Sequence, residues 1–204
     1  MTRLMRDSTT AADIPVHGTE LVAGYGNGAY AWTAADWARF PDARHVAIDV
    51  NGSDPGGCGV LDVETGDATV AEAVTWVHRR TAAAPGSYVP VIYCNRSTLT
   101  PLFNAMNAAG LKIVTHFRLW VATLDGIEIL ADMTGVTAVQ ARGANLTGGH
   151  YDESIVYDDA WHPGPAAPPP PPPPAELDGQ VVWWSGGALH NRGVISADAG
   201  RTWS

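Results

Sequence analysis

Two acidic residues, Asp62 and Glu64, carry the clearest chemical signal in the sequence. They lie two residues apart in the segment GVLDVETGDAT, which is typical of a strand followed by a turn, so both side chains are expected on one face of that strand. Two neighbouring carboxyl groups raise each other's pKa, which suits a division into a proton donor and a base or nucleophile, as glycoside hydrolysis requires. A solvated strand end that happens to carry two acids explains the same spacing.

Two further aspartates are candidates for the same site. Asp49 interrupts the apolar run HVAIDVNG, where a buried and unpaired carboxylate is costly, so it is expected at the rim, paired or functional. Asp152 stands at the start of the last strand-like run. If the strands close into a ring, we expect Asp49, Asp62, Glu64 and Asp152 to converge on one end of it.

Side chains suited to binding a sugar end several other strand-like runs. Aromatic rings offer stacking surfaces and amides form hydrogen bonds; the candidates are Tyr93, Trp120, Gln140 and Tyr151. For each aromatic residue taken alone, a place in the hydrophobic core is the alternative interpretation.

Neither metal nor cofactor is expected. The seven histidines show no short paired spacing, and the two cysteines do not form a four-ligand zinc pattern. Cys94 lies in the strand-like run VPVIYCN and is expected to be a small buried hydrophobic residue. Cys58 lies in a glycine-rich loop, and nothing in the sequence requires a bridge between the two.

The elements that position these residues lie in the segment 20–162. Its strand-like runs are short, rich in β-branched residues and bounded by Gly, Pro, Asn or Asp; they cover 21–25, 45–50, 59–64, 88–93, 117–122, 136–140 and 154–157. Helical patterns lie between several of them, with Thr33, Asp67 or Thr69, and Ser97 as N-caps and Gly110 at a helix end. This alternation predicts an α/β fold, a parallel sheet closed into a small or incomplete TIM-like (β/α) barrel, since the segment is far shorter than the ~250 residues of a typical one.

Three other segments flank the barrel segment. Residues 1–19 are a polar lead-in without periodicity, and residues 163–174 (PGPAAPPPPPPP) predict a stiff polyproline linker. Residues 175–204 predict a short β-hairpin tail. Its end, SADAGRTW, fits the pattern S-x-D-x-G-x-T-W and resembles the Asp-box turns of sialidases and other β-propellers, where the motif is structural.

Composition excludes several classes of protein. Of 204 residues, 46% are hydrophobic and only 16% are charged, which indicates a chain that forms a core. The net charge of −9 argues against a nucleic-acid-binding surface and against an electrostatic membrane anchor. No apolar run reaches the ~18 residues of a membrane-spanning helix, and the N-terminus lacks the apolar stretch of a signal peptide. We therefore expect a protein made in the cytoplasm without membrane insertion.

The order of the later motifs resembles a known enzyme family. The sequence LDVE followed by PVIYCN, RLWVAT, AVQ and YDESIVYD is similar to the second half of glycoside hydrolase family 25 barrels, and more so to the reduced domains of this type in actinobacteria and their phages. The resemblance covers residues 59–157. It implies that Glu64 is the general acid, that Asp62 orients it or stabilises developing positive charge, and that Asp152 positions the substrate, the glycan of peptidoglycan.

The front half departs from that family. The family's first strand carries an aspartate, whereas the first strand-like run here, 21–25, has none, so Asp49 on the next run is the nearest substitute. By the same comparison, about two βα units are missing.

Two functional hypotheses follow from these observations. The first is a phage-associated, endolysin-like domain of the muramidase type that cleaves or binds bacterial cell-wall glycan. The second is a catalytically inactive structural or adhesive virion component, such as a minor tail protein or head decoration, that displays the barrel through the proline arm. In that case residues 1–19 or 175–204 attach it to other virion proteins or to another copy.

Overall fold

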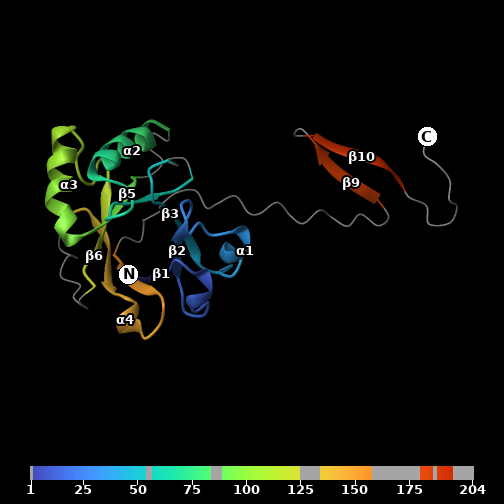
Figure 1. Ribbon diagram of the computed structural model, residues 1–204, viewed down its shortest axis with the longest axis horizontal. Helices are drawn as coiled ribbons and strands as arrows, with labels where there is room; N and C mark the ends of the chain where they lie inside the picture. Colours follow the sequence, from blue (N-terminus) through green and yellow to red (C-terminus); the bar gives the residue numbers. More distant parts are fainter. Residues whose placement is uncertain are drawn as a thin grey trace. The chain divides into compact units, whose positions relative to one another are not determined.

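The computed structural model describes residues 2–53, 57–83, 89–124, 134–157, 180–185 and 188–194. The chain divides into two compact units, Met1–Ala167 and Pro168–Ser204 (Figure 1). In the second unit, β9 (Gln180–Ser185) and β10 (Ala188–Val194) pair as an antiparallel two-stranded sheet, in the region where the sequence predicts a hairpin. The proline run and the Asp-box-like segment lie outside the described residues.

The first unit is a mixed α/β fold built around a closed barrel of eight strands. The strands follow one another around the barrel in chain order: β1 (Arg3–Asp7), β2 (Leu21–Tyr25), β3 (Arg44–Asp49), β4 (Val60–Asp62), β5 (Val91–Asn95), β6 (Arg118–Ala122), β7 (Val136–Arg142) and β8 (Asp152–Val156). Strands β1 to β7 run parallel to one another, and β8 runs antiparallel to both of its neighbours, β7 and β1. The prediction of an α/β fold with a barrel is therefore confirmed, but the barrel is closed, and the sheet predicted to be parallel has one reversed strand.

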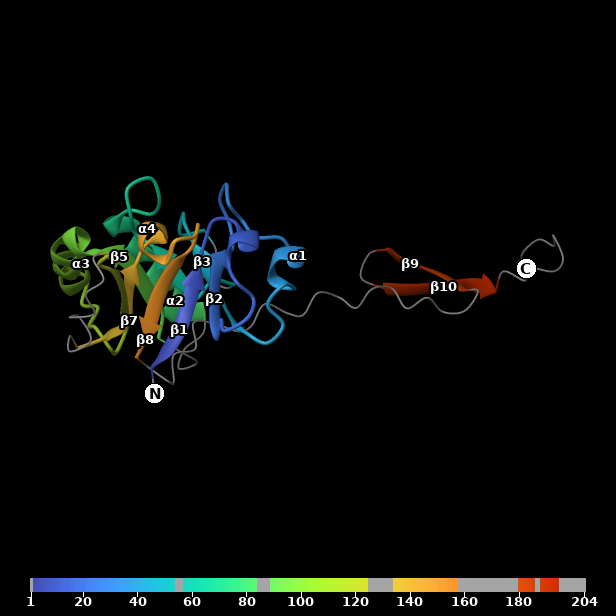
Figure 2. The ribbon, with the colours of Figure 1, turned by 90° about the horizontal axis from the view of Figure 1, so that it is seen from below.

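The N-terminal segment, predicted to be a polar lead-in over residues 1–19 outside the barrel, contributes strand β1 to it. Strand β1 pairs in parallel with β2 and in antiparallel with β8, and Figure 2 shows it between these two strands. With β1 included, the barrel has eight strands, so the front half lacks long helices but no strand of the closed barrel. The front half is short because its connections are short: η1 (Ala11–Asp13) is a single 3-10 turn and α1 (Ala34–Trp37) has four residues.

Apolar side chains fill the barrel interior. Successive strand residues alternate between the two faces, so Met5 and Asp7 on β1 both point inward, with Arg6 between them on the outside. The interior cluster consists of Met5, Leu21, Ala23, Val46, Ile48, Val60, Val91, Trp120, Ala138 and Val156. Three partly buried residues pack against this cluster: Tyr25, Val50 and Tyr93. The inward-facing rows thus change from apolar to polar at the carboxyl-terminal end of the parallel strands.

Two longer helices cover one side of the barrel. Helices α2 (Val70–Ala83) and α3 (Arg96–Ala108) lie beside each other over β5 and its neighbours (Figure 1). Trp76 and Leu102 from these helices pack on outward residues such as Ile92, in a cluster of buried apolar side chains. Thr69 and Glu72 form the capping box of α2, as predicted for Thr69.

The start of α3 differs from the prediction. Asn95, the last residue of β5, is its N-cap and accepts a hydrogen bond from the backbone N–H of Thr98 at 3.1 Å. Ser97, the expected cap, already lies inside the helix. Gly110 follows the helix with a φ of +75°, which suits glycine and confirms the predicted end.

The outer face of β2 is covered by η1, α1 and the loops beside them. Trp32 and Phe40 stack with ring centroids 5.8 Å apart in a cluster with Ile14 and Val22. A Cβ at Gly24 would lie 2.4 Å from the Trp32 ring, so only glycine permits this packing. Helix α4 (Ala144–Thr147) connects β7 to β8. Within the described ranges, no helix combines the length and the apolar character needed to cross a membrane.

Strand β1 offers a direct test of the barrel's closure. Met5 is fully buried in the interior, so Met5→Ala should lower the free energy of unfolding by about 2–5 kcal/mol through lost packing and the cavity left behind. The matched control is Val16→Ala, at a side chain that is 40% exposed, which should change stability by less than about 0.5 kcal/mol. Urea unfolding measures both variants. Equal stabilities for the two variants would contradict a structural role for β1.

Candidate functional site

Four acidic side chains gather at the carboxyl-terminal end of the barrel, and we call Asp7, Asp62, Glu64 and Asp152 the acid cluster. Asp7 and Asp62 end β1 and β4, and Glu64 lies in the turn after β4. Asp152 begins β8, and because β8 runs in the opposite direction its first residue lies at the same end of the barrel. Asp7 and Asp152 are register partners across the β1–β8 pair. Three distant parts of the sequence therefore supply one cluster.

Gln140 on β7 links the first and last strands of the barrel. Its Nε2 donates a hydrogen bond to Asp152 Oδ2 at 2.6 Å and lies 3.4 Å from Asp7 Oδ2. The Tyr93 hydroxyl donates to Gln140 Oε1, which fixes the orientation of the amide. Gln140 is itself almost fully buried, so its position is set by these partners.

The two deeper acids favour their protonated forms. Asp7 is 7% exposed and Asp62 is 3% exposed. Burial, with the charges of Asp152 and Glu64, raises the pKa of Asp7 well above its usual value. Burial, with the charges of Glu64, Asp67 and Asp7, raises the pKa of Asp62 to about 8. Oδ1 of each residue is buried and has no hydrogen-bond partner among the described residues. No donor there stabilises negative charge on this oxygen, which favours the protonated carboxyl group.

The two outer acids are half-buried and have hydrogen-bond donors. Burial raises the pKa of Glu64, and a hydrogen bond from the Asn95 side chain acts in the opposite direction. Burial also raises the pKa of Asp152, opposed by hydrogen bonds from the backbone of Ala144 and the side chain of Gln140. The acid cluster therefore combines buried, proton-holding carboxyl groups with outer ones that are better able to ionise.

Of the residues proposed from the sequence, Asp49 lies outside the acid cluster. Ile48 packs inside the barrel and Val50 against its edge, so Asp49 between them points outward, toward α2. Its carboxylate is fully buried and accepts hydrogen bonds from Trp76 Nε1 at 3.0 Å and Asn27 Nδ2 at 2.8 Å. The expected convergence of Asp49 with the other acids is therefore wrong, and pairing explains its burial.

Two of the aromatic candidates take part in packing. Trp120 is fully buried inside the barrel, edge-on to Tyr93 with ring centroids 4.6 Å apart, and its Nε1 donates to Ser154 Oγ at 2.9 Å. Tyr151 packs on the outer cluster of β2, with the Arg6 guanidinium 5.5 Å from its ring centre. Trp120 is therefore a core residue, and Tyr151 packs on the outside of the barrel.

Sequence reasoning missed three residues at this end of the barrel. Asp7 ends β1, a strand that the sequence did not reveal. Tyr25 ends β2. Burial raises the pKa of its hydroxyl, and the charges of Asp7 and Asp62 add to this effect, so Tyr25 lies beside the acid cluster. Asn95, immediately before a helix, carried the ordinary signal of an N-cap.

No metal centre is evident in the described part of the chain, where no group of three or more His, Cys, Asp or Glu side chains is arranged to hold an ion. Cys58 and Cys94 are buried free thiols. Burial raises the pKa of Cys94 to about 12, as expected for a small side chain within the helix-covered core.

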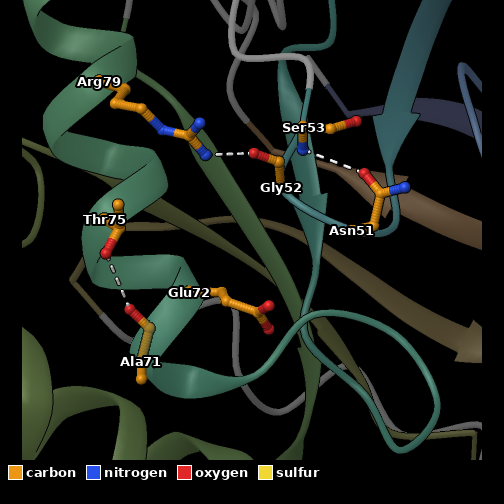
Figure 3. Close-up of a pocket in the computed structure, with 7 residues that line it drawn as sticks. All are labelled: Asn51, Gly52, Ser53, Ala71, Glu72, Thr75 and Arg79. Carbon is orange, nitrogen blue, oxygen red and sulfur yellow. Dashed lines mark hydrogen bonds between the residues drawn. The ribbon is translucent and has the colours of Figure 1, made fainter.

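A surface pocket of about 400 Å³ lies apart from the acid cluster, between the loop after β3 and α2 (Figure 3). Its lining residues are Asn51, Gly52, Ser53, Ala71, Glu72, Thr75 and Arg79. Arg79 reaches across the pocket to donate to the carbonyl of Gly52, and the carboxylate of Glu72 accepts both hydrogen bonds of the Thr69 cap. Arg79 thus joins the loop after β3 to α2, and Glu72 caps the start of the same helix.

Comparison of the chain with protein-family models, curated proteins and solved structures finds no match.

The raised pKa of Asp62 predicts that the folded protein is less stable at pH 8 than at pH 5. Asp62 ionises near 3.8 when unfolded but near 8 when folded, so the folded state binds more protons between these values. Stability falls as the pH rises through this window, by up to about 1.4 kcal/mol per pH unit for one such group. Asp62→Asn should reduce the difference between urea unfolding at pH 5 and pH 8. The control, Asp42→Asn at an exposed acid before β3, should preserve it; an unchanged difference in Asp62→Asn would contradict the assignment.

The contact between Asn95 and Glu64 gives a second prediction. Asn95→Asp keeps a good N-cap for α3, but it removes the amide donor and sets a carboxylate against Glu64, so the pKa of Glu64 should rise by about 1. Carboxyl-carbon NMR titration measures this pKa directly. The control, Ser97→Ala, removes a hydroxyl that donates to Asn95 Oδ1 and should leave the pKa nearly unchanged. A Glu64 titration identical in Asn95→Asp and the wild type would rule out the contact.

Proposed function

We propose that the barrel is a glycoside-hydrolase-like domain, of TIM-like (β/α) descent, that acts on bacterial cell-wall glycan at the acid cluster. The observation that carries the proposal is the convergence of Asp7, Asp62, Glu64 and Asp152 at one end of a closed barrel. In parallel α/β barrels this is the end at which catalytic groups lie. The motif order from β4 to β8 supports the same family, as does Asp7 at the end of the first strand.

Glu64 is the general acid in this proposal. It is less buried than Asp62, so it is better placed to reach a bound sugar, and its raised pKa suits it to carry a proton near neutral pH. Glu64 donates this proton to the glycosidic oxygen as the bond to the anomeric carbon breaks, and the leaving sugar departs as an alcohol. A water molecule then adds to the anomeric carbon and returns a proton to Glu64. The net reaction is hydrolysis.

The other acids prepare the site for this step. Burial, with the charge of Glu64 among others, raises the pKa of Asp62 to about 8, so Asp62 holds its proton near neutral pH. Asp62 thereby orients Glu64 and keeps a proton close to it. Asp152, held by Gln140, is the outer carboxylate that positions the substrate and stabilises positive charge at the anomeric carbon.

Cell-wall hydrolysis is tested with purified walls of actinobacteria. Wild-type protein should lower the turbidity of the suspension and release soluble muropeptides. Glu64→Gln should reduce release at least about 100-fold, since it preserves shape but removes the proton. Asp42→Asn, which changes an exposed carboxylate at the other end of the barrel, should retain wild-type activity. Equal release by wild type and Glu64→Gln would exclude the proposed acid.

An architectural alternative is a non-catalytic adhesive component of a phage particle. The division of the chain into a barrel unit and a second unit with its own two-stranded sheet favours it, because such an arrangement suits a displayed module joined to an attachment element. In this case the wild-type protein binds cell walls without releasing fragments and is incorporated into particles. Wall pelleting without muropeptide release favours this alternative, and absence of both binding and release removes both proposals.

A further inference from the structure

Tyr30 presents an aromatic ring next to the acid cluster. It is 62% exposed, the highest value among the large hydrophobic side chains described as exposed. Its ring centre lies 6.4 Å from that of Tyr25, with 55° between the ring planes. Because Tyr25 ends β2 and faces Asp7 and Asp62, Tyr30 lies at the outer side of the same end of the barrel.

The loop that carries Tyr30 is held at both ends. The N–H of Gly26 donates to the Ile48 carbonyl at 2.7 Å, and the N–H of Trp32 donates to the Tyr25 carbonyl at 2.8 Å. Asn27 joins the loop to β3 through Asp49, at 2.8 Å, and through the N–H of Val50, at 3.0 Å. A ring on such a loop loses little conformational freedom when a ligand binds, which favours a role in recognition.

The opposite side of the barrel end carries an exposed aliphatic residue. Leu124 follows β6, four strands from β2 in a ring of eight, and is 47% exposed. Its N–H donates to the Gln140 carbonyl at 3.1 Å, and its φ is +55°, an unusual conformation for leucine. A Cβ at Gly143 would lie 3.5 Å from Leu124 Cδ2 and 3.7 Å from Asp152 Oδ1, so the leucine side chain and the acid flank the same glycine.

We propose that a bound glycan crosses the end of the barrel from Tyr30 to Leu124, with the acid cluster between these two contacts. The inference rests on the proposed function and adds the direction and length of the site. The face of a pyranose ring that carries C–H groups stacks on Tyr30, and an acetamido methyl group or a second ring face contacts Leu124. Between them, the carboxyl groups and Gln140 exchange hydrogen bonds with hydroxyl groups. Because acidic groups dominate this end, the sugars in contact with them are uncharged ones.

The test compares the affinities of N-acetylglucosamine oligomers of two and six units, measured by calorimetry. We expect the hexamer to bind wild type more tightly than the dimer does, because contacts at both ends of the site favour the longer chain. Tyr30→Ala and Leu124→Ala should each weaken hexamer binding about 3- to 10-fold. Tyr30→Phe, which keeps the ring, should bind like wild type.

Val114→Ala is the matched control for Leu124→Ala. Val114 is 41% exposed and also has a positive φ, of 72°, but it precedes β6 and so lies at the other end of the barrel. Its hexamer affinity should equal that of wild type. Wild-type affinity in both Tyr30→Ala and Leu124→Ala overturns the inference while leaving the proposed function intact. A wild-type protein that neither binds the oligomers nor acts on walls overturns both. An effect of Tyr30→Ala on self-association alone assigns the ring to a protein contact and also overturns the inference.

Discussion

The pairing of β1 with β8 is the constraint on which the rest of the structure depends. It joins the first strand to the last, closes the barrel and sets Asp7 opposite Asp152 in register. On the outer face, Arg6 and Glu153 form an ion pair at 3.1 Å across the same two strands. On the inner face, Gln140 contacts both aspartates. Closure of the barrel therefore also brings Asp7 and Asp152 together in the acid cluster.

Burial of several carboxyl groups at one end of the barrel opposes folding, and the rest of the molecule must offset it. The interior below the acid cluster is mainly apolar, from Met5 to Trp120, with Ser154 accepting the hydrogen bond of Trp120 Nε1, and α2 and α3 add a second core outside the sheet. Asp49 shows the contrast. It is as deeply buried as Asp62, but its oxygens accept hydrogen bonds from Trp76 and Asn27, so it serves the architecture. The unpartnered Oδ1 atoms of Asp7 and Asp62 have no such structural explanation, which is typical of groups kept for chemistry.

The sequence predicts the strands from β2 to β8 well because each is a short apolar run between turn residues. It conceals β1 because RLMRD contributes one apolar residue, Met5, to the interior and carries charges on both faces, so neither alternation nor an apolar run appears. Asp7 was missed with its strand. The predicted position of Asp49 is wrong for a different reason. Parallel strands are apolar on both faces, so the alternation of β3 does not reveal which face is interior. The pairing of Asp62 with Glu64 was predictable from their spacing, whereas their convergence with Asp7 depends on closure, which no local pattern encodes.

The different environments of the four acids suggest how one cluster can hold both a proton and a charge. Four carboxyl groups in close proximity cannot all ionise near neutral pH, and the energetic cost of ionisation is greatest where burial is deepest and donors are absent. Burial thus favours the protonated forms of Asp7 and Asp62, whereas hydrogen bonds from Gln140 and Ala144 favour the ionised form of Asp152 and oppose the effect of its burial. Asp62 is therefore better suited to orient Glu64 and hold a proton beside it than to stabilise a cation by its charge. Glu64 lies between these extremes, because burial favours its protonated form while Asn95 favours its ionised form. A group that must give up a proton in one step and recover it in the next requires such a balance, and Asn95, fixed by its role as the cap of α3, provides the donor that maintains it.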